Sequence, residues 1–123
     1  CEFPTVAPAE VGKPSRFSYL AVHKPGIDIS QEMFGAIACF DHQKNILTTT
    51  ELRPNCYPME PIYAPNTEDS QKGWVLTVLF DGDRNCSEVW IFDSSKLDAE
   101  PVCRLALPEV IPMGFHGTWS QEY

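Results

Sequence analysis

The chain contains two copies of a unit built from short, apolar segments of β-strand character. The predicted strands are 17–22, 36–40 and 46–52 in the first copy, and 61–64, 74–80, 88–92 and 102–107 in the second. Eleven prolines interrupt most windows of helical length, and helical periodicity is nearly absent. Four short antiparallel strands per unit, recurring after roughly fifty residues, are typical of the blades of a β-propeller. We therefore predict an all-β fold of antiparallel four-stranded blades.

Each copy opens on a glutamate with apolar neighbours, and a third opening, at the end of the chain, contains a histidine instead. These residues are Glu2, Glu60 and His116, and they follow one another at nearly equal intervals. Because the first strand of a propeller blade lines the central channel, we expect the three side chains to converge on one axis. An unpaired carboxylate among apolar neighbours would be unfavourable. The alternative is that both glutamates cap loops at the edge of a blade.

His116 has the surroundings expected of a metal ligand. Gly114 and Gly117 remove side chains on either side of it, so backbone or a ligand can approach closely. Phe115 and Trp119 can shield the imidazole from water, and neutral imidazole is a common ligand of first-row metals. Considered by itself, His116 fits a buried, hydrogen-bonded histidine better than a metal ligand, and its alignment with Glu2 and Glu60 shifts the balance toward a metal site. A glutamate that accepts a ring N–H from a metal-bound histidine would fix its orientation.

Composition and charge exclude several classes of protein. The 123 residues are 43% hydrophobic and 21% charged, which suits a soluble globular chain. No apolar run reaches the length of a membrane helix. A net charge of −8 argues against a nucleic-acid partner. The five cysteines are odd in number and lack CxxC spacing, so we predict neither a disulfide framework nor a zinc site. Free cysteines suit a reducing compartment, and we therefore predict a cytoplasmic setting.

Two blades cannot close a ring, so we expect the chain to be the C-terminal fragment of a larger propeller. Within residues 1–123, we place the first blade at 1–53 and the second at 54–108. Residues 109–123 would then begin a closing strand. An exposed sheet edge would otherwise have to be protected in some other way.

Several stretches together resemble the C-terminal part of the carotenoid cleavage dioxygenases, the family of the retinal pigment epithelial membrane protein. The stretches are 1–4, 57–63, 73–76 and 111–119. The resemblance implies a seven-bladed propeller with iron(II) on its axis, held by four histidines. It implies that His116 is the last of these ligands, and that Glu2 and Glu60 hydrogen-bond to ligating histidines. The implied reaction inserts dioxygen across a conjugated double bond of a carotenoid, apocarotenoid or stilbene-like substrate, giving carbonyl products.

The other three ligands implied by the resemblance are absent from the chain. His23 follows a strand and His42 lies in a polar turn, so both are expected to face solvent. The fragment alone is therefore expected to be inactive, and any peripheral membrane contact would belong to the missing regions. The alternative function is a non-catalytic β-propeller binding module, with Glu2, Glu60 and His116 as structural channel residues. A secreted, disulfide-linked domain is disfavoured by the odd number of cysteines.

Overall fold

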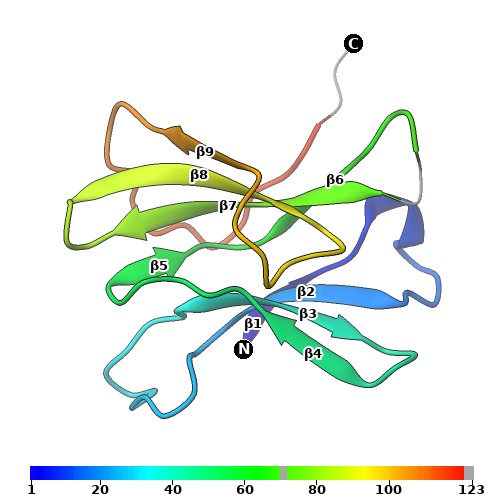
Figure 1. Ribbon diagram of the computed structural model, residues 1–123, viewed down its shortest axis with the longest axis horizontal. Coiled ribbons are helices and arrows are strands. Elements are labelled where there is room, and N and C mark those ends of the chain that lie inside the picture. Colours follow the sequence, from blue (N-terminus) through cyan, green and yellow to red (C-terminus); the bar gives the residue numbers. More distant parts are fainter. Residues whose placement is uncertain (70–71, 121–123) are drawn as a thin grey trace.

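A computed structural model describes residues 1–69 and 72–120 and divides their strands between two antiparallel sheets (Figure 1). The first sheet has the order β1-β2-β3-β4, so each strand pairs with its neighbours in the chain. Its strands are β1 (Glu2–Thr5), β2 (Phe17–Val22), β3 (Ala36–Asp41) and β4 (Ile46–Thr49), with one turn of 3-10 helix, η1 (Pro8–Glu10), after β1. This is the meander predicted for one blade.

The second sheet has the same plan, but its leading strand is interrupted. Its strands are β5 (Cys56–Pro58), β6 (Ile62–Pro65), β7 (Gly73–Asp81), β8 (Cys86–Asp93) and β9 (Cys103–Ala106). Both β5 and β6 pair with the same edge of β7, where Pro58 lies opposite Leu79 and Ile62 opposite Leu76. They are therefore two halves of one strand, and Glu60 lies in the gap between them. The sequence at 53–58 predicts a loop, but β5 forms within this stretch, because an edge position tolerates a proline.

The alternation of side chains in β7 decides which face of the second sheet is buried. Val75 and Leu79 are fully buried, whereas Trp74 on the opposite face is 37% exposed. Successive side chains of a strand point to opposite faces, which produces this pattern. The sequence predicts a central strand here because its residues are largely apolar on both faces, and β7 does lie between β5/β6 and β8. In the structure, only one of the two faces packs against the other sheet.

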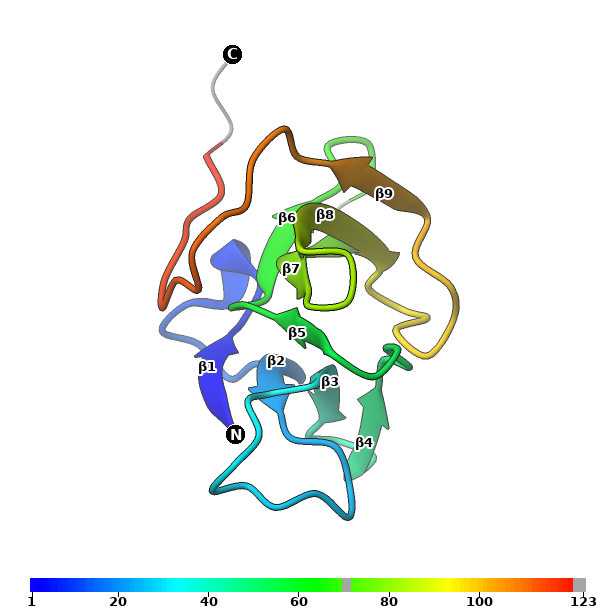
Figure 2. The same ribbon diagram turned by 90° about the vertical axis from the view of Figure 1, so that its left-hand side faces the viewer.

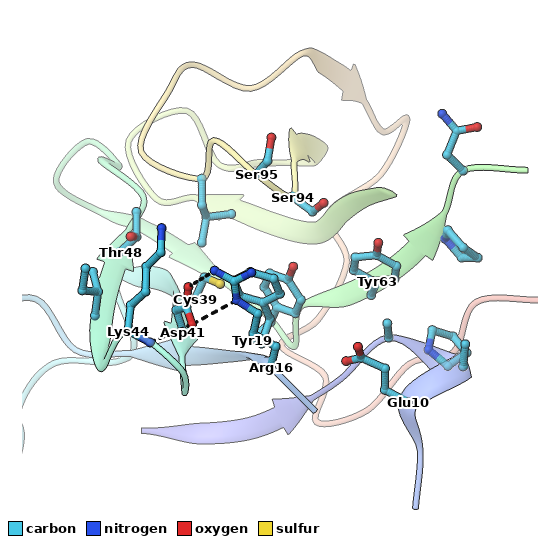
Figure 3. Close-up of a pocket in the computed structure, with 18 residues that line it drawn as sticks. Glu10, Arg16, Tyr19, Cys39, Asp41, Lys44, Thr48, Tyr63, Ser94 and Ser95 are labelled. Carbon is cyan, nitrogen blue, oxygen red and sulfur yellow. Dashed lines mark hydrogen bonds and ion pairs between the residues drawn. The ribbon is translucent and has the colours of Figure 1, made fainter. Parts of the chain in front are cut away.

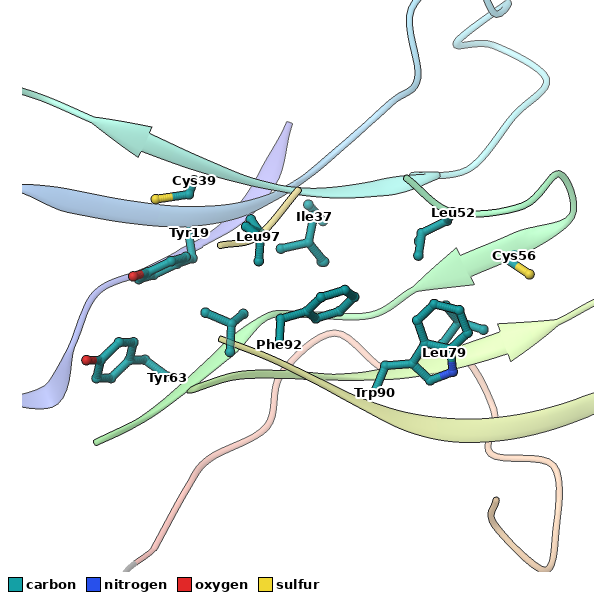
Figure 4. Close-up of a cluster of buried hydrophobic side chains, with 12 residues drawn as sticks. Tyr19, Ile37, Cys39, Leu52, Cys56, Tyr63, Leu79, Trp90, Phe92 and Leu97 are labelled. Atoms are coloured by element: carbon teal, nitrogen blue, oxygen red, sulfur yellow. The ribbon is translucent and has the colours of Figure 1, made fainter. Parts of the chain in front are cut away.

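The hydrophobic core lies between the two sheets (Figure 4). Tyr19 and Ile37 reach it from the first sheet, and Leu79 and Phe92 from the second. The rings of Tyr19 and Tyr63 stack across the interface with centroids 5.7 Å apart. Burial of apolar area contributes about 25 cal/mol per Å², so this layer holds the sheets together.

The aspartates that end strands shape the turns between them. Oδ1 of Asp41 accepts the N–H groups of Gln43 and Lys44, at 3.0 and 3.1 Å. Asp81 accepts two N–H groups in the next hairpin in the same way, each at 3.0 Å. These side-chain bonds satisfy backbone donors that a turn leaves free. The predicted turns at 41–45 and 81–85 are thus present.

Asp93 also ends a strand, and its Oδ1 accepts the N–H of Ser95 at 2.8 Å. The sequence at 93–98 predicts a turn, with a single helical turn as one form of it; no helix forms there, and residues 94–95 and 97–98 make turns. The strand predicted at 46–52 ends early, at Thr49. There the Thr50 side chain replaces the regular ladder by accepting the N–H of Ile37 at 3.0 Å.

The chain after β9 runs beside the second sheet without forming a strand in residues 107–120. Separate hydrogen bonds hold it: the Leu107 N–H donates to the Ser87 carbonyl oxygen at 3.0 Å, the Ile111 N–H donates to Oγ of Ser87 at 2.9 Å, and the Gly117 N–H donates to Glu60. The start of a closing strand predicted for 109–123 is therefore not formed as a strand in the described part, because no backbone ladder pairs with it. Residues 121–123 lie outside the described residues. Within the described ranges, no helix is both long and apolar enough to cross a membrane.

Candidate functional site

The leading strands of the two sheets and the C-terminal segment lie on the same side of the molecule (Figure 2). β1 forms one edge of the first sheet, and β5 and β6 form the corresponding edge of the second. The last strands, β4 and β9, form the opposite edges. Residues near the starts of the two sheets can therefore meet His116.

Glu60 and His116 are brought together at this edge. The side chain of Glu60 lies in the gap between β5 and β6, and it is only 15% exposed. Its Oε1 lies 3.3 Å from Nδ1 of His116, and its Oε2 accepts the backbone N–H of Gly117 at 2.7 Å. A carboxylate can only accept, so Nδ1 is the donor, and the tautomer is assigned from this partner. One carboxylate thus holds both the ring and the backbone beside it.

The imidazole of His116 presents its second nitrogen, Nε2, without a partner among the described residues. With Nδ1 protonated, Nε2 carries the free lone pair that a metal requires. Described residues 1–69 and 72–120 contain no group of three or more His, Cys, Asp or Glu side chains able to hold a metal. The chemistry of His116 therefore fits one position of a coordination sphere.

The two glycines around His116 differ in what they do. A Cβ on Gly117 would lie 2.9 Å from Cδ1 of Ile62, so a larger residue would have to displace the tip of that side chain. A Cβ on Gly114 would only reach ordinary contact, 4.0 Å from Sδ of Met59. The predicted aromatic shield is also absent in this chain, where the His116 side chain is 77% exposed.

Glu2 does not share the surroundings of Glu60. It is exposed, and the described part of the chain offers it no hydrogen-bond or ion-pair partner. The expectation that it packs between apolar neighbours was wrong, because the alternation along β1 turns Glu2 outward and Phe3 inward. Its neighbour Phe3 does reach the site, with its ring 5.7 Å from that of His116. The role of Glu2 toward a histidine stays a prediction.

The two other histidines lie outside this arrangement. His42 is exposed, as expected, and its Nε2 lies 2.9 Å from Oγ of Ser18. His23 is half-buried, contrary to expectation, because its ring packs on Phe34 with centroids 4.6 Å apart. Neither contacts His116.

Sequence reasoning missed Phe3 as a member of the site. Its backbone has a positive φ of 55°, at an irregularity in the pairing of β1 with β2. A left-handed conformation costs a residue other than glycine about 1–2 kcal/mol. Phenylalanine rarely adopts this conformation, so the residue type at position 3 gave no reason to expect it. Ser87, which anchors Ile111, was missed for a similar reason: its partner is 24 residues away.

A separate cleft of about 700 Å³ opens between the two sheets, away from His116 (Figure 3). Arg16 and Asp41 form an ion pair at its wall, with Nη2 and Oδ2 2.9 Å apart. The guanidinium, aided by turn N–H groups, lowers the pKa of Asp41 to about 2. Burial raises the pKa of the Cys39 thiol to about 11, so this cysteine is a poor nucleophile. Burial likewise raises the pKa of Tyr19. These groups are kept in their usual protonation states and suit packing better than catalysis.

Two antiparallel meanders with their leading strands on one side define part of a β-propeller, and the Glu60–His116 pair lies at the edge where those strands start. The chain belongs to the retinal pigment epithelial membrane protein family, whose model matches residues 1–121. The predicted resemblance to the carotenoid cleavage dioxygenases is thereby confirmed.

Named relatives are similar over nearly the whole chain. Apocarotenoid-15,15'-oxygenase of Synechocystis sp. is 34% identical over 98% of this chain and 25% of its own length. The chloroplastic 9-cis-epoxycarotenoid dioxygenase of Arabidopsis thaliana is 32% identical over 91% of this chain and 18% of its own. The chain thus spans about a quarter or less of these relatives.

A solved structure shows the same architecture. Cobalt-substituted apocarotenoid oxygenase of Synechocystis superposes with a TM-score of 0.89 at 30% identity, covering 99% of this chain and 26% of that one. Similarity at this level confirms the predicted fold class, antiparallel four-stranded blades from a seven-bladed β-propeller.

Proposed function

We propose that the full-length protein containing this chain is an iron(II)-dependent dioxygenase that cleaves a conjugated double bond of a carotenoid or apocarotenoid to carbonyl products. The observation that supports this most directly is the bond between Nδ1 of His116 and Glu60. The relatives named above oxidise substrates of this class, according to their names. A stilbene-like substrate with the same kind of conjugated bond belongs in the same assay.

In this proposal, His116 contributes one of four imidazole ligands, and residues outside the chain contribute the other three. Iron(II) held by neutral nitrogens with an open position would supply the activation of dioxygen. Glu60 would keep Nδ1 protonated, hold the ring in place and offset positive charge near the site. We propose that Glu2 does the same for a ligating histidine from the remaining part of the protein. Residues 1–123 alone would then hold iron poorly and would not turn over substrate.

The test uses the full-length protein purified with iron. His116→Ala should remove most of the bound iron and abolish cleavage of an apocarotenoid, measured as loss of the polyene absorbance. His42→Ala is the matched control, because His42 is exposed and its side chain contacts Ser18 and Phe40 and not the Glu60–His116 pair. It should keep both iron and activity. Normal cleavage by the His116→Ala protein would contradict the proposal.

A milder change separates orientation from ligation. Glu60→Gln keeps an acceptor for Gly117 but removes the negative charge and allows the imidazole to change tautomer. Partners of this kind typically contribute 10- to 100-fold to metal affinity or activity. We expect a loss of activity in that range, with iron partly retained, and smaller than the loss caused by His116→Ala.

We also propose that the protein works in the cytoplasm. All five cysteines are free thiols in the structure, which suits a reducing compartment. Cell fractionation with a tagged full-length protein tests this directly. Recovery of the protein in the membrane pellet, and its release from the pellet by salt, would indicate peripheral membrane attachment instead.

A further inference from the structure

We propose that Phe3 is a positioning residue for the His116 imidazole, reaching it from the leading strand of the other sheet. The inference rests on the proposed function only in treating that imidazole as an iron ligand. The contact itself is a property of residues 1–120. It would make the orientation of a ligand supplied after the second sheet depend on the first strand of the first sheet.

The backbone of β1 is bent to make this contact. Glu2 pairs with Ala21, but Thr5 pairs with Tyr19, so the register slips by one residue between them. Phe3 lies at this irregularity and has a φ of 55°, in a backbone region that residues other than Gly, Asn and Asp rarely occupy. Bulges of this kind bend a strand and re-aim a side chain. Strained backbone persists where surrounding contacts determine it, and here those contacts are aromatic.

The Phe3 ring packs between the ring of Phe34 and the imidazole of His116. Its centroid is 6.0 Å from Phe34 at 80° and 5.7 Å from His116 at 90°, both edge-to-face arrangements. Phe115, the residue before His116, lies 6.3 Å away, so the ring touches two successive side chains of the C-terminal segment. Phe3 is half-buried and also packs against the core cluster.

Glu60 alone leaves one freedom to the imidazole. A single bond at Nδ1 fixes that atom but lets the ring plane pivot about the bond. The edge-to-face contact with Phe3 opposes the pivot, because it is favourable only at a limited range of ring angles. Together, the carboxylate and the phenyl ring determine where Nε2 points.

The experiment compares Phe3→Leu with Phe17→Leu in the full-length protein loaded with cobalt(II). Phe17 is also half-buried in the first sheet and packs against the same core, but its ring lies under the guanidinium of Arg16. The first readout is the visible absorption of cobalt, which responds to ligand geometry. The second is the rate at which a chelator removes the metal. The third is the effect on KM and kcat of the iron form.

We expect Phe3→Leu to shift the cobalt bands, to raise the rate of metal release roughly three- to tenfold and to lower kcat more than it changes KM. Phe17→Leu should leave the bands and the release rate unchanged. A Phe3→Leu protein with wild-type bands and release rate, whether or not KM changes, would overturn the inference and leave the proposed function intact. A wild-type protein that binds no stoichiometric metal would overturn the proposed function itself, and this inference with it.

If Phe3→Leu does not fold, Phe3→Tyr and Phe3→Met provide a second test of the same inference. Tyrosine retains the ring edge and should preserve the wild-type cobalt bands. Methionine retains bulk without a ring and should shift them. Identical bands in the two variants would show that only bulk matters at this position, and would overturn the inference.

Discussion

The two leading strands of this chain each carry a glutamate, but the two glutamates have different surroundings. In the second sheet, the strand is split, and Glu60 sits in the gap with both carboxylate oxygens bonded. In the first sheet, the strand continues through a bulge, and Glu2 points outward. The step from Glu60 to its histidine is 56 residues. The same step from Glu2 reaches Pro58, which is buried and has no N–H to donate. Equivalent positions in the two copies therefore place both glutamates on a leading strand, but among the described residues only Glu60 has a hydrogen-bond donor from the C-terminal segment beside it.

The largest expected effect tests the packing beneath the two strands. Leu79 lies opposite Pro58 and is fully buried, whereas the residue opposite Glu2 is Ala21, also fully buried. Leu79→Ala should lower the free energy of unfolding by about 3 kcal/mol, because it leaves a cavity under the split strand. The measurement is the urea midpoint of the purified protein. Ala21→Gly is the partner variant, with an expected loss of about 1 kcal/mol. Equal losses would mean that the two strands are supported alike.

The next effect concerns the two glutamates in protein without metal. Glu60→Ala removes the acceptor of the Gly117 N–H and should destabilise the protein by about 1.5 kcal/mol, as expected for a hydrogen bond to a charged group. Glu2→Ala should change stability by less than about 0.5 kcal/mol, because an exposed side chain without partners contributes little. Thermal unfolding of the two metal-free variants side by side makes the measurement. A larger loss for Glu2→Ala would show that the remaining protein supplies it with a partner.

A smaller effect tests how the split strand is held closed. Thr77 is buried, and its hydroxyl donates to the carbonyl oxygen of Met59 at 3.0 Å, within the gap. Thr77→Val keeps the shape but leaves that carbonyl without this donor, so we expect a loss of about 1 kcal/mol. Hydrogen exchange of the Met59 amide, which donates to Val78, should become faster. Thr49→Val, at an exposed position of β4, serves as the control and should have no effect.

The last prediction is a pH dependence that belongs to the first sheet. The pKa of Asp41 is lowered to about 2 by its bond to Arg16, against an ordinary value of about 3.9. A carboxyl whose pKa falls on folding stabilises the protein above its unfolded pKa. That contribution is lost as the pH drops from about 4 toward 2. Asp41→Asn should therefore flatten the pH dependence of unfolding in this window. Asp98→Asn, at an exposed site outside the strands, should leave it unchanged, and an unaltered profile for both would contradict the assignment.

Much of the architecture follows from the sequence because period-two alternation and Asp-initiated turns are local signals. The hairpin of β7 and β8 and its turn at Asp81 could be predicted in this way. The repeat also pointed to a common location for Glu60 and His116. The split in the second leading strand could not be predicted, because Pro58 and Pro61 are typical of a loop. Only the pairing of both halves with β7 shows that they belong to one strand. The left-handed backbone of Phe3 depends on contacts across the sheets, which no local pattern contains.

The two oxygens of Glu60 act on neighbouring residues of a segment that no strand ladder holds. One oxygen accepts the Gly117 N–H, and the other lies 3.3 Å from Nδ1 of His116, so a single carboxylate acts on the peptide and the ring together. A change in the rotamer of Glu60 would therefore shift the Gly117 amide and the imidazole at the same time.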